Sequence, residues 1–219
     1  MVTIEAVSSF FTSFSSHLSH RKRDISRSAF ALEQRRKVCH MKIVVTGVPG
    51  VGKSTCMKAA SEAKNLKIVN FGDFMFEAAK EMGVKDRDQM RKMPVEKQRE
   101  IQKKAAEKLG KMDNIIVDTH ATIKTTRGFL PGLPAWVIQK IDPTTIFLVE
   151  ASPKEIYNRR NKDPTRARDA DSEDEIRMHQ EFNRMAAISY AALCGATVKV
   201  ITNADGKVDA AVKEVLASL

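Results

Sequence analysis

The chain has 219 residues, of which 42% are hydrophobic and 29% charged, so its composition predicts one globular domain with or without a tail. The formal charge of +10 favours polyanionic partners such as nucleotides, RNA or an acidic membrane surface. The sequence has no run of 18 apolar residues and no closely spaced pair among Cys39, Cys56 and Cys194, which argues against a membrane-spanning helix, a disulfide framework and a zinc site. We therefore expect a cytoplasmic protein in a reducing compartment.

Residues 1–40 differ in composition from the remainder of the chain. They hold eight Ser and seven Lys or Arg against three acids, without helical or strand periodicity. Three interpretations stay open: a disordered tail or a non-native extension from an upstream start codon ahead of Met41, an organelle transit peptide, or an arm that binds RNA or a membrane. The folded domain is expected to span residues 41–219.

The clearest chemistry stands near the start of that domain. The β-branched run from Lys42 to Thr46 predicts a buried strand, and the stretch from Ser54 to Lys64 predicts a helix. Between them lies G-x-x-x-x-G-K-[ST], a loop whose backbone N–H groups cradle phosphates, with Lys53 on the β- and γ-phosphates and the Ser54 hydroxyl on Mg²⁺. The expected ATP-binding residues are Gly47, Val48, Pro49, Gly50, Val51, Gly52, Lys53, Ser54 and Thr55.

The next segment offers a second site for an anion. A strand is predicted over residues 67–71, and Asp73 lies in the first turn of a helix that runs to about Met82. In a short helix that follows, Arg87 and Arg91 are four residues apart and would share a face where a second anion could dock; a solvated charged face is the alternative. Pro94 then suits the first turn of a longer helix.

The longer helix is expected to bury Ile101, Ala105 and Leu109 on its inner face. After it, a third strand from Asn114 ends in Asp118, as P-loop enzymes present a carboxylate to Mg²⁺; an Asp that caps the next turn is the alternative. Residues 119–134 are expected to form an ordered loop near anions, because cations stand among rigid Pro and Gly residues. These cations are Lys124 and Arg127.

Four arginines lie within ten residues beyond the fourth predicted strand, residues 144–149. They follow a helix that a capping box at Ser152 opens. Arginines of this kind can close over a triphosphate and neutralise the charge that moves during phosphoryl transfer; a surface salt-bridge loop with Asp163, Asp169 and Asp171 is the alternative. The four are Arg159, Arg160, Arg166 and Arg168.

A second capping box at Ser172 predicts a helix to about Cys194, and a fifth strand over residues 197–201 precedes a turn at Asn203 and a last helix. Strands that alternate with helices predict an α/β fold of the P-loop NTPase type, with a five-stranded parallel sheet covered on both faces. In such a sheet ligands bind at the carboxyl ends of the strands, where the phosphate-binding loop, Asp73, Asp118 and the Asn203 turn all fall.

The residue types and their spacing do not by themselves identify the molecule that accepts the phosphate. A hydroxyl acceptor usually needs a base, and Asp73 is the obvious candidate in a small-molecule kinase. A nucleoside monophosphate needs arginines instead, because its phosphate is mostly dianionic at neutral pH. A GTPase is disfavoured, since residues 161–163 lack the gap of N-K-x-D and no glycine completes D-x-x-G after Asp118. The charge also permits a nucleotide-gated RNA or ribosome-assembly factor, which is not the favoured interpretation.

Residues 41–219 resemble archaeal-type adenylate kinase almost end to end. The resemblance implies the reaction ATP + AMP ⇌ 2 ADP with Mg²⁺, an arm for the monophosphate around residues 71–100, a short lid around 159–172, and a homo-oligomer, often a trimer. It places AMP at Asp73, Arg87, Arg91 and Lys124, where Lys124 stands in place of an arginine. It rests on the phosphate-binding loop and on residues 69–73, 85–91, 118–120, 130–134 and 197–201.

Overall fold

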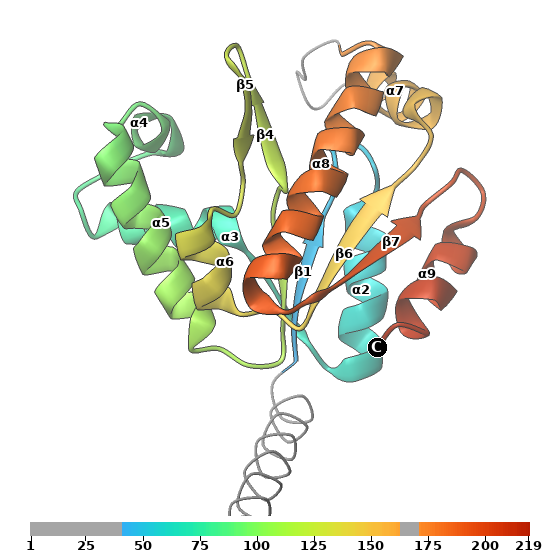
Figure 1. Cartoon of the computed structure of the whole chain (residues 1–219), viewed down its shortest axis with the longest axis horizontal. Coiled ribbons are helices and arrows are strands. Elements are labelled where there is room, and N and C mark those ends of the chain that lie inside the picture. Colours follow the sequence, from blue (N-terminus) through green and yellow to red (C-terminus); the bar gives the residue numbers. More distant parts are fainter. Residues whose placement is uncertain (1–40, 163–170) are drawn as a thin grey trace, which may run out of the picture. The chain divides into compact units, whose positions relative to one another are not determined.

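Five parallel strands form the central sheet, in the order β2-β3-β1-β6-β7. The computed structural model describes residues 41–162 and 171–219. The interpretations of residues 1–40, Cys39, Arg166, Arg168 and most of the expected lid therefore lie outside the described residues. The strands are β1 (Lys42–Thr46), β2 (Lys67–Asn70), β3 (Ile115–Asp118), β6 (Thr145–Glu150) and β7 (Thr197–Thr202), as Figure 1 shows. All five predicted strands are confirmed.

One face of the sheet is covered by α2 (Lys53–Lys64) and α9 (Val208–Leu216). Strand side chains that point to this face, among them Val45 and Phe147, pack against Met57 and Val215 of the two helices. The alternation of side chains along each strand makes this possible, since neighbouring residues face opposite sides. Because α2 starts directly after the loop that follows β1, its packing fixes where its N-terminus points.

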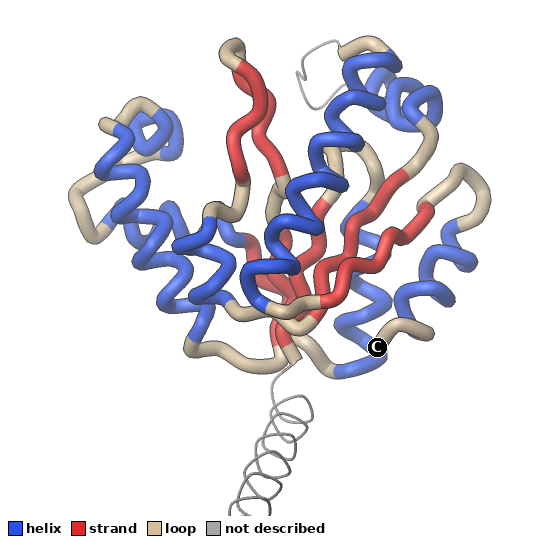
Figure 2. The backbone as a smooth tube through the Cα atoms, in the orientation of Figure 1, coloured by secondary structure: helices blue, strands red, loops and turns tan. Residues whose placement is uncertain are grey.

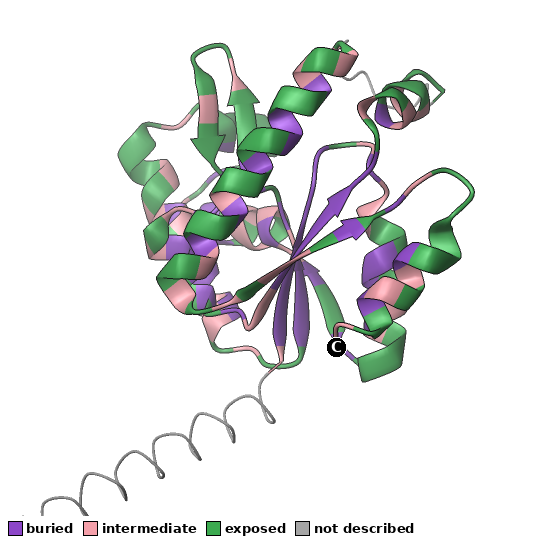
Figure 3. Cartoon of the chain, turned by 45° about the vertical axis from the view of Figure 1, so that its right-hand side comes forward, coloured by how far each residue is buried: buried purple, intermediate pink, exposed green. Residues whose placement is uncertain are grey.

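The opposite face is covered by α5 (Val95–Gly110), α6 (Ala135–Ile141) and α8 (Glu173–Cys194). Ala105 and Leu109 of α5 are fully buried here, and Ile101 is buried in a smaller cluster with α3 (Phe71–Lys80) and α4 (Arg87–Arg91). The predicted inner face of α5 is thus confirmed. Strands β1, β3 and β6 are buried almost throughout between the two helical layers, whereas the edge strands β2 and β7 are partly exposed (Figure 3).

The expected loop over residues 119–134 is wrong in its middle part. It contains an antiparallel hairpin of β4 (Thr122–Thr125) and β5 (Gly128–Pro131), which projects beyond the central sheet beside α8 (Figure 2). Periodicity could not reveal these strands, because neither contains an apolar β-branched run: β4 reads TIKT, and β5 reads GFLP with Gly128 and Pro131 at its ends. Tertiary contacts hold the hairpin instead: Asn183 of α8 accepts hydrogen bonds from the Thr122 amide at 3.1 Å and from its hydroxyl at 2.6 Å.

Smaller corrections concern the ends of elements. Phe71 is the first residue of α3 and not the end of β2, because the Asn70 side chain caps that helix. Pro94 precedes α5 as its N-cap residue and does not lie in its first turn. Both predicted capping boxes, at the starts of α7 (Pro153–Asn161) and α8, are confirmed. In residues 41–162 and 171–219, each helix is too short or too polar to traverse a lipid bilayer.

Candidate active site

The phosphate-binding loop connects β1 to α2 and depends on glycine for its shape. Gly52 caps α2 in the left-handed region, with φ of 87°, and a Cβ there would lie 2.3 Å from Asn203 Nδ2. A Cβ on Gly47 would lie 2.5 Å from the Val149 carbonyl oxygen. Only glycine allows these two approaches. They leave the first amides of α2, which have no partner within the helix, free to bind an anion.

Lys53 begins α2 and points to the end of β3. Its ammonium donates to the Thr119 carbonyl at 2.9 Å and lies 3.0 Å from Asp118 Oδ1, outside hydrogen-bonding geometry. Oδ1 is buried and accepts no hydrogen bond from the part of the chain that is described. The Lys53 ammonium and a carboxylate oxygen of Asp118 that accepts no hydrogen bond from the described residues thus lie together at the carboxyl edge of the sheet, beside the phosphate-binding loop.

Arg159 holds the outer side of the same loop. Its guanidinium donates to the Val51 carbonyl at 3.1 Å, to the Asn203 carbonyl at 2.8 Å and to Asp205 at 2.8 Å. Asn203 also donates from its side chain to the Val51 carbonyl at 2.8 Å. The end of α7 and the turn after β7 therefore support the loop together. Sequence reasoning placed both segments near the site but did not detect these contacts, which join residues far apart in the chain.

Arg160 and Lys124 meet on one carboxylate. Arg160 donates to Asp171 Oδ2 at 2.7 Å and to the Pro49 carbonyl at 2.9 Å, and Lys124 donates to Asp171 Oδ1 and to Glu175 at 2.7 and 2.8 Å. Burial by itself would raise the pKa of Asp171, but the hydrogen bonds from Lys124 and Arg160 outweigh it and lower that pKa. This network joins the phosphate-binding loop, α7, α8 and the hairpin.

The second predicted anion site lies on α3 and α4. Arg87 forms an ion pair with Asp73, and its guanidinium lies 5.5 Å from the centre of the Phe76 ring. Arg91 pairs with Asp88 at 2.9 Å, and its side chain is 70% exposed. The structure therefore gives Arg87 a fixed place near the carboxyl end of β2, whereas Arg91 remains on the surface of α4.

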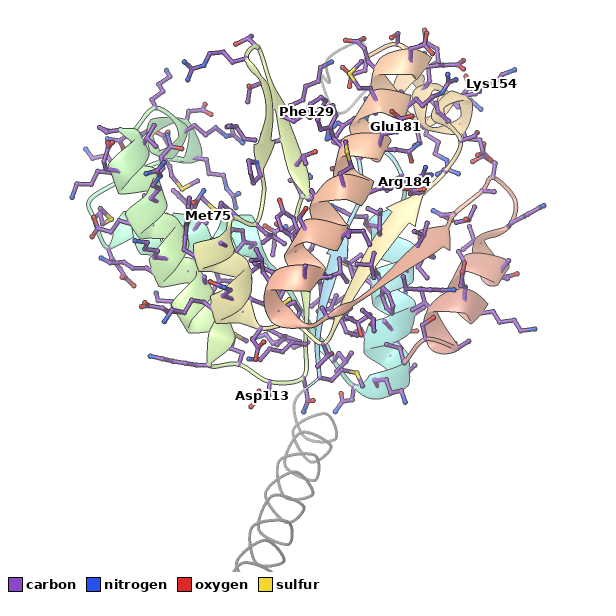
Figure 4. All side chains as sticks on the ribbon, in the orientation of Figure 1. Met75, Asp113, Phe129, Lys154, Glu181 and Arg184 are labelled. Atoms are coloured by element: carbon purple, nitrogen blue, oxygen red, sulfur yellow. The ribbon has the colours of Figure 1, made fainter. Side chains whose placement is uncertain are left out.

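His120 lies two residues after Asp118, just beyond the end of β3. It has contact with solvent, yet surrounding protein and then the nearby Lys53 charge lower its pKa to about 4. The imidazole is thus neutral at pH 7 and adds no positive charge to the site. The hairpin beyond it contacts α8 through Phe129, which Figure 4 labels. The Phe129 ring stacks on Phe182 with 4.4 Å between the ring centres.

Comparison with known proteins gives the family. A family model described as an AAA domain matches residues 46–177. Adenylate kinase of Thermoplasma acidophilum is 50% identical over 177 residues, which cover 80% of this chain and 97% of the relative. Adenylate kinase of Methanopyrus kandleri is 54% identical in an alignment that covers 78% of this chain and 94% of the relative. Adenylate kinase of Methanocaldococcus jannaschii is 53% identical in an alignment that covers 80% of this chain and 95% of the relative. The chain belongs to the adenylate kinase family.

As an adenylate kinase it catalyses phosphoryl transfer between ATP and AMP, which yields two ADP, and ATP, AMP and ADP are its substrates and products. A solved shikimate kinase from Acinetobacter baumannii in complex with shikimate has a TM-score of 0.52 at 15% identity and covers 82% of this chain and 93% of its own. That likeness supports the P-loop fold of this adenylate kinase and nothing further. The predicted family, the five-stranded P-loop fold and the reaction of ATP with AMP are confirmed, whereas the dependence on Mg²⁺, the monophosphate arm and the lid stay predictions.

Proposed function

We propose that this adenylate kinase binds the polyphosphate of ATP in the loop from Gly47 to Thr55, with the Lys53 ammonium on the β- and γ-phosphates. The observation that carries the proposal is the position of Lys53, 3.0 Å from Asp118 and beside the free amides of α2. Phosphate oxygens would take the place of the Thr119 carbonyl and the Asp118 carboxylate as partners of this ammonium. Loop and lysine would then stabilise the same developing charge.

Mg²⁺ is the metal that these residues fit. Magnesium in nucleotide sites is held by one or two protein oxygens together with phosphates and water. Asp118 Oδ1 is buried without a hydrogen bond from the described residues, and Ser54 stands exposed at the start of α2. We propose these two as the metal-side residues. The ion would supply charge neutralisation between the phosphates, while Asp118 and Ser54 hold its place.

On the acceptor side, we propose that Arg87 and Arg91 bind the AMP phosphate, with Asp73 fixing Arg87. Two anions must approach each other during transfer, so guanidinium groups that hold the second anion lower the barrier. The arm would span about residues 71–100. Lys124 is a further candidate for the acceptor phosphate, whose oxygens would replace Asp171 and Glu175. The ion pair of Asp73 with Arg87 argues against Asp73 as the base of a hydroxyl kinase.

We infer that Arg159, Arg160, Arg166 and Arg168 belong to a lid over about residues 159–172 that closes on the triphosphate. Arg159 and Arg160 support this role because both reach carbonyl oxygens of the phosphate-binding loop. A closed lid would also exclude water, which otherwise competes with AMP as the phosphoryl acceptor. Arg166 and Arg168 enter the proposal from the sequence and the family resemblance.

The test is steady-state ADP formation from ATP and a panel of AMP, CMP, UMP and GMP, with Mg²⁺ or with a chelator. We expect AMP to be the preferred acceptor and the chelator to abolish turnover. Lys53→Met should lower kcat by at least about 100-fold with an unchanged melting temperature. Lys58→Met is the matched control, because Lys58 lies on the same helix in an exposed pair with Glu62 and should leave turnover intact. Full activity of Lys53→Met would refute the proposal.

We further propose that copies of the chain associate through the outer face of α8. Its residues Met178, Phe182, Met185, Ile188 and Leu193 are 38 to 62% exposed, and no residue from 185 to 196 is charged. Figure 3 shows that outer face mostly exposed. Contiguous apolar residues exposed on a surface often mark a site of protein–protein contact. A second copy that met residues 185–196 would bring an equally uncharged surface, so that a chain of charge +10 could associate there without burying unpaired charges.

Light scattering coupled to gel filtration tests this association. We expect a single oligomer, a trimer by the family resemblance, and smaller species for Ile188→Glu. Lys58→Glu introduces a carboxylate on α2, which covers the opposite face of the sheet, and serves as the control. A wild-type monomer at 100 μM, on the order of a weak interface's dissociation constant, would refute the inference.

The free thiols of Cys56 and Cys194 support a reducing cytoplasm as the compartment we propose.

A further inference from the structure

Asn70 lies where the two nucleotide sites adjoin. It is the last residue of β2, and its Cα partner on the neighbouring parallel strand is Asp118. Side chains at paired positions of neighbouring strands point to the same face of a sheet. The Asn70 carboxamide and the Asp118 carboxylate therefore stand side by side at the carboxyl edge, between the phosphate-binding loop and α3.

Both ends of the Asn70 carboxamide are used. Nδ2 donates to Asp118 Oδ2 at 3.2 Å, and Oδ1 accepts from the Asp73 amide at 3.2 Å as the N-cap of α3. The partners fix the orientation of the amide, because the backbone N–H needs the oxygen and the carboxylate needs the N–H. With Oδ2 held in this way, Asp118 presents Oδ1 to Lys53.

The contacts continue to the acceptor side. Asp73, whose amide Asn70 accepts, forms the ion pair with Arg87. Gly72 packs closely against this arrangement, since a Cβ there would lie 3.0 Å from Asn70 Oδ1 and 3.5 Å from Arg87 Nη1. A continuous series of polar contacts thus runs from Lys53 through Asp118, Asn70 and Asp73 to Arg87.

We propose that Asn70 is a positioning residue that couples ATP binding to AMP binding, because its one carboxamide both orients Asp118 and starts the helix that holds Arg87. The inference rests on the proposed roles of Lys53, Asp118 and Arg87. Polyphosphate that draws Lys53 away from Asp118 removes the ammonium that balances this carboxylate. The Asn70 carboxamide, which stays bonded to Asp118 Oδ2, transmits the change to the start of α3. ATP and AMP then raise each other's affinity by the same factor, as linkage requires.

The residue type agrees with this role. An N-cap alone needs only an acceptor, which Ser, Thr or Asp would supply as well. Asp at position 70 would set a second negative charge beside Asp118, and the shorter Ser and Thr would lose the bond to Oδ2. Of the usual N-cap residues, asparagine alone combines an acceptor for the helix with a separate donor for the carboxylate.

Calorimetric titration of AMP, with and without a saturating Mg²⁺ complex of a non-hydrolysable ATP analogue, measures the coupling directly. In the wild type we expect the analogue to tighten AMP binding at least about 5-fold. Asn70→Ser keeps the helix cap and loses the bond to Asp118. It should keep the wild-type melting temperature and the wild-type affinity for AMP in the absence of the analogue, while the tightening of AMP binding by the analogue falls below about 2-fold. Asn70→Ala loses both functions and should also have a lower melting temperature.

Asn70→Thr is a second variant with the same capping group, which keeps the test decisive if Asn70→Ser folds poorly. Wild-type coupling that survives in the Ser and Thr variants would overturn the proposal, as would a wild type in which the analogue leaves AMP affinity unchanged. A wild type that binds no AMP under either condition would instead contradict the proposed acceptor site. The two failures are therefore distinguishable.

Discussion

Arg160 and Asp171 form an ion pair, with 2.7 Å between Nη1 and Oδ2, whose side chains are only 7 and 12% exposed. Arg160 also donates to the Pro49 carbonyl of the phosphate-binding loop. Removing one partner of an ion pair that is shielded from water lowers the stability of the fold, because the other charge remains buried and uncompensated. The position of one side of the loop therefore depends on a carboxylate at the start of α8.

Asp171→Asn should destabilise the fold by up to about 3 kcal/mol, because it removes the charge that Arg160 and Lys124 share. The measurement is the free energy of unfolding in urea. Asp88→Asn is the control, since the Asp88–Arg91 pair is exposed and should contribute less than about 1 kcal/mol. Equal costs for the two variants would show that the Asp171 network carries no special weight.

Gly52→Ala should abolish ATP binding. The backbone at Gly52 is left-handed, which costs an L-residue roughly 1–2 kcal/mol, and the new Cβ would also clash with Asn203. Gly206→Ala has a similar φ of 69° and open space around it, so it should share the loss of stability and keep ATP affinity. Equilibrium binding of a fluorescent ATP analogue and urea unfolding separate the two effects. ATP affinity retained by Gly52→Ala would contradict the geometry described for the loop.

Arg87→Ala should raise the KM for AMP at least about 10-fold and leave the KM for ATP within about 2-fold, because Arg87 is placed on the acceptor side only. Arg99→Ala is the matched control, since Arg99 lies over the Trp136 ring, 5.4 Å from its centre, on the adjacent helix α5. Steady-state kinetics with each nucleotide varied in turn give both constants. An equal rise in both KM values would argue for a general loss of structure.

Acid should weaken the fold through His120. Partial desolvation of its ring by the surrounding protein and the nearby Lys53 charge lower the pKa of His120 from 6.5 to about 4 in the folded state, although the residue reaches solvent. The unfolded chain therefore takes up the proton first as pH falls. The contribution to stability is complete above pH 6.5 and is lost as pH falls towards 4. His179, whose pKa burial also lowers, acts in the same direction.

The melting temperature measured from pH 7.5 to 4 tests this contribution. His120→Gln should have a flatter profile than the wild type over that interval, with part of the slope left by His179. An unchanged slope in His120→Gln would mean that His120 titrates alike in the folded and unfolded chain.

The sequence determined the elements whose signals are local. Five β-branched runs gave the sheet, and the glycine spacing from Gly47 to Gly52 identified the loop, because both depend on residues that are neighbours in the chain. The capping boxes at Ser152 and Ser172 marked two helix starts for the same reason. The family followed from the order and spacing of such segments, and the relatives confirmed it.

Only the tertiary structure decided which polar groups meet. The bond of Asn70 to Asp118 joins residues 48 apart, and the contact of Arg159 with Val51 joins residues 108 apart. Such pairs depend on strand order and on how α7 and α8 pack, which no local periodicity encodes. The hairpin from Thr122 to Pro131 escaped prediction likewise, since its strands contain no apolar β-branched run and are held by contacts with α8.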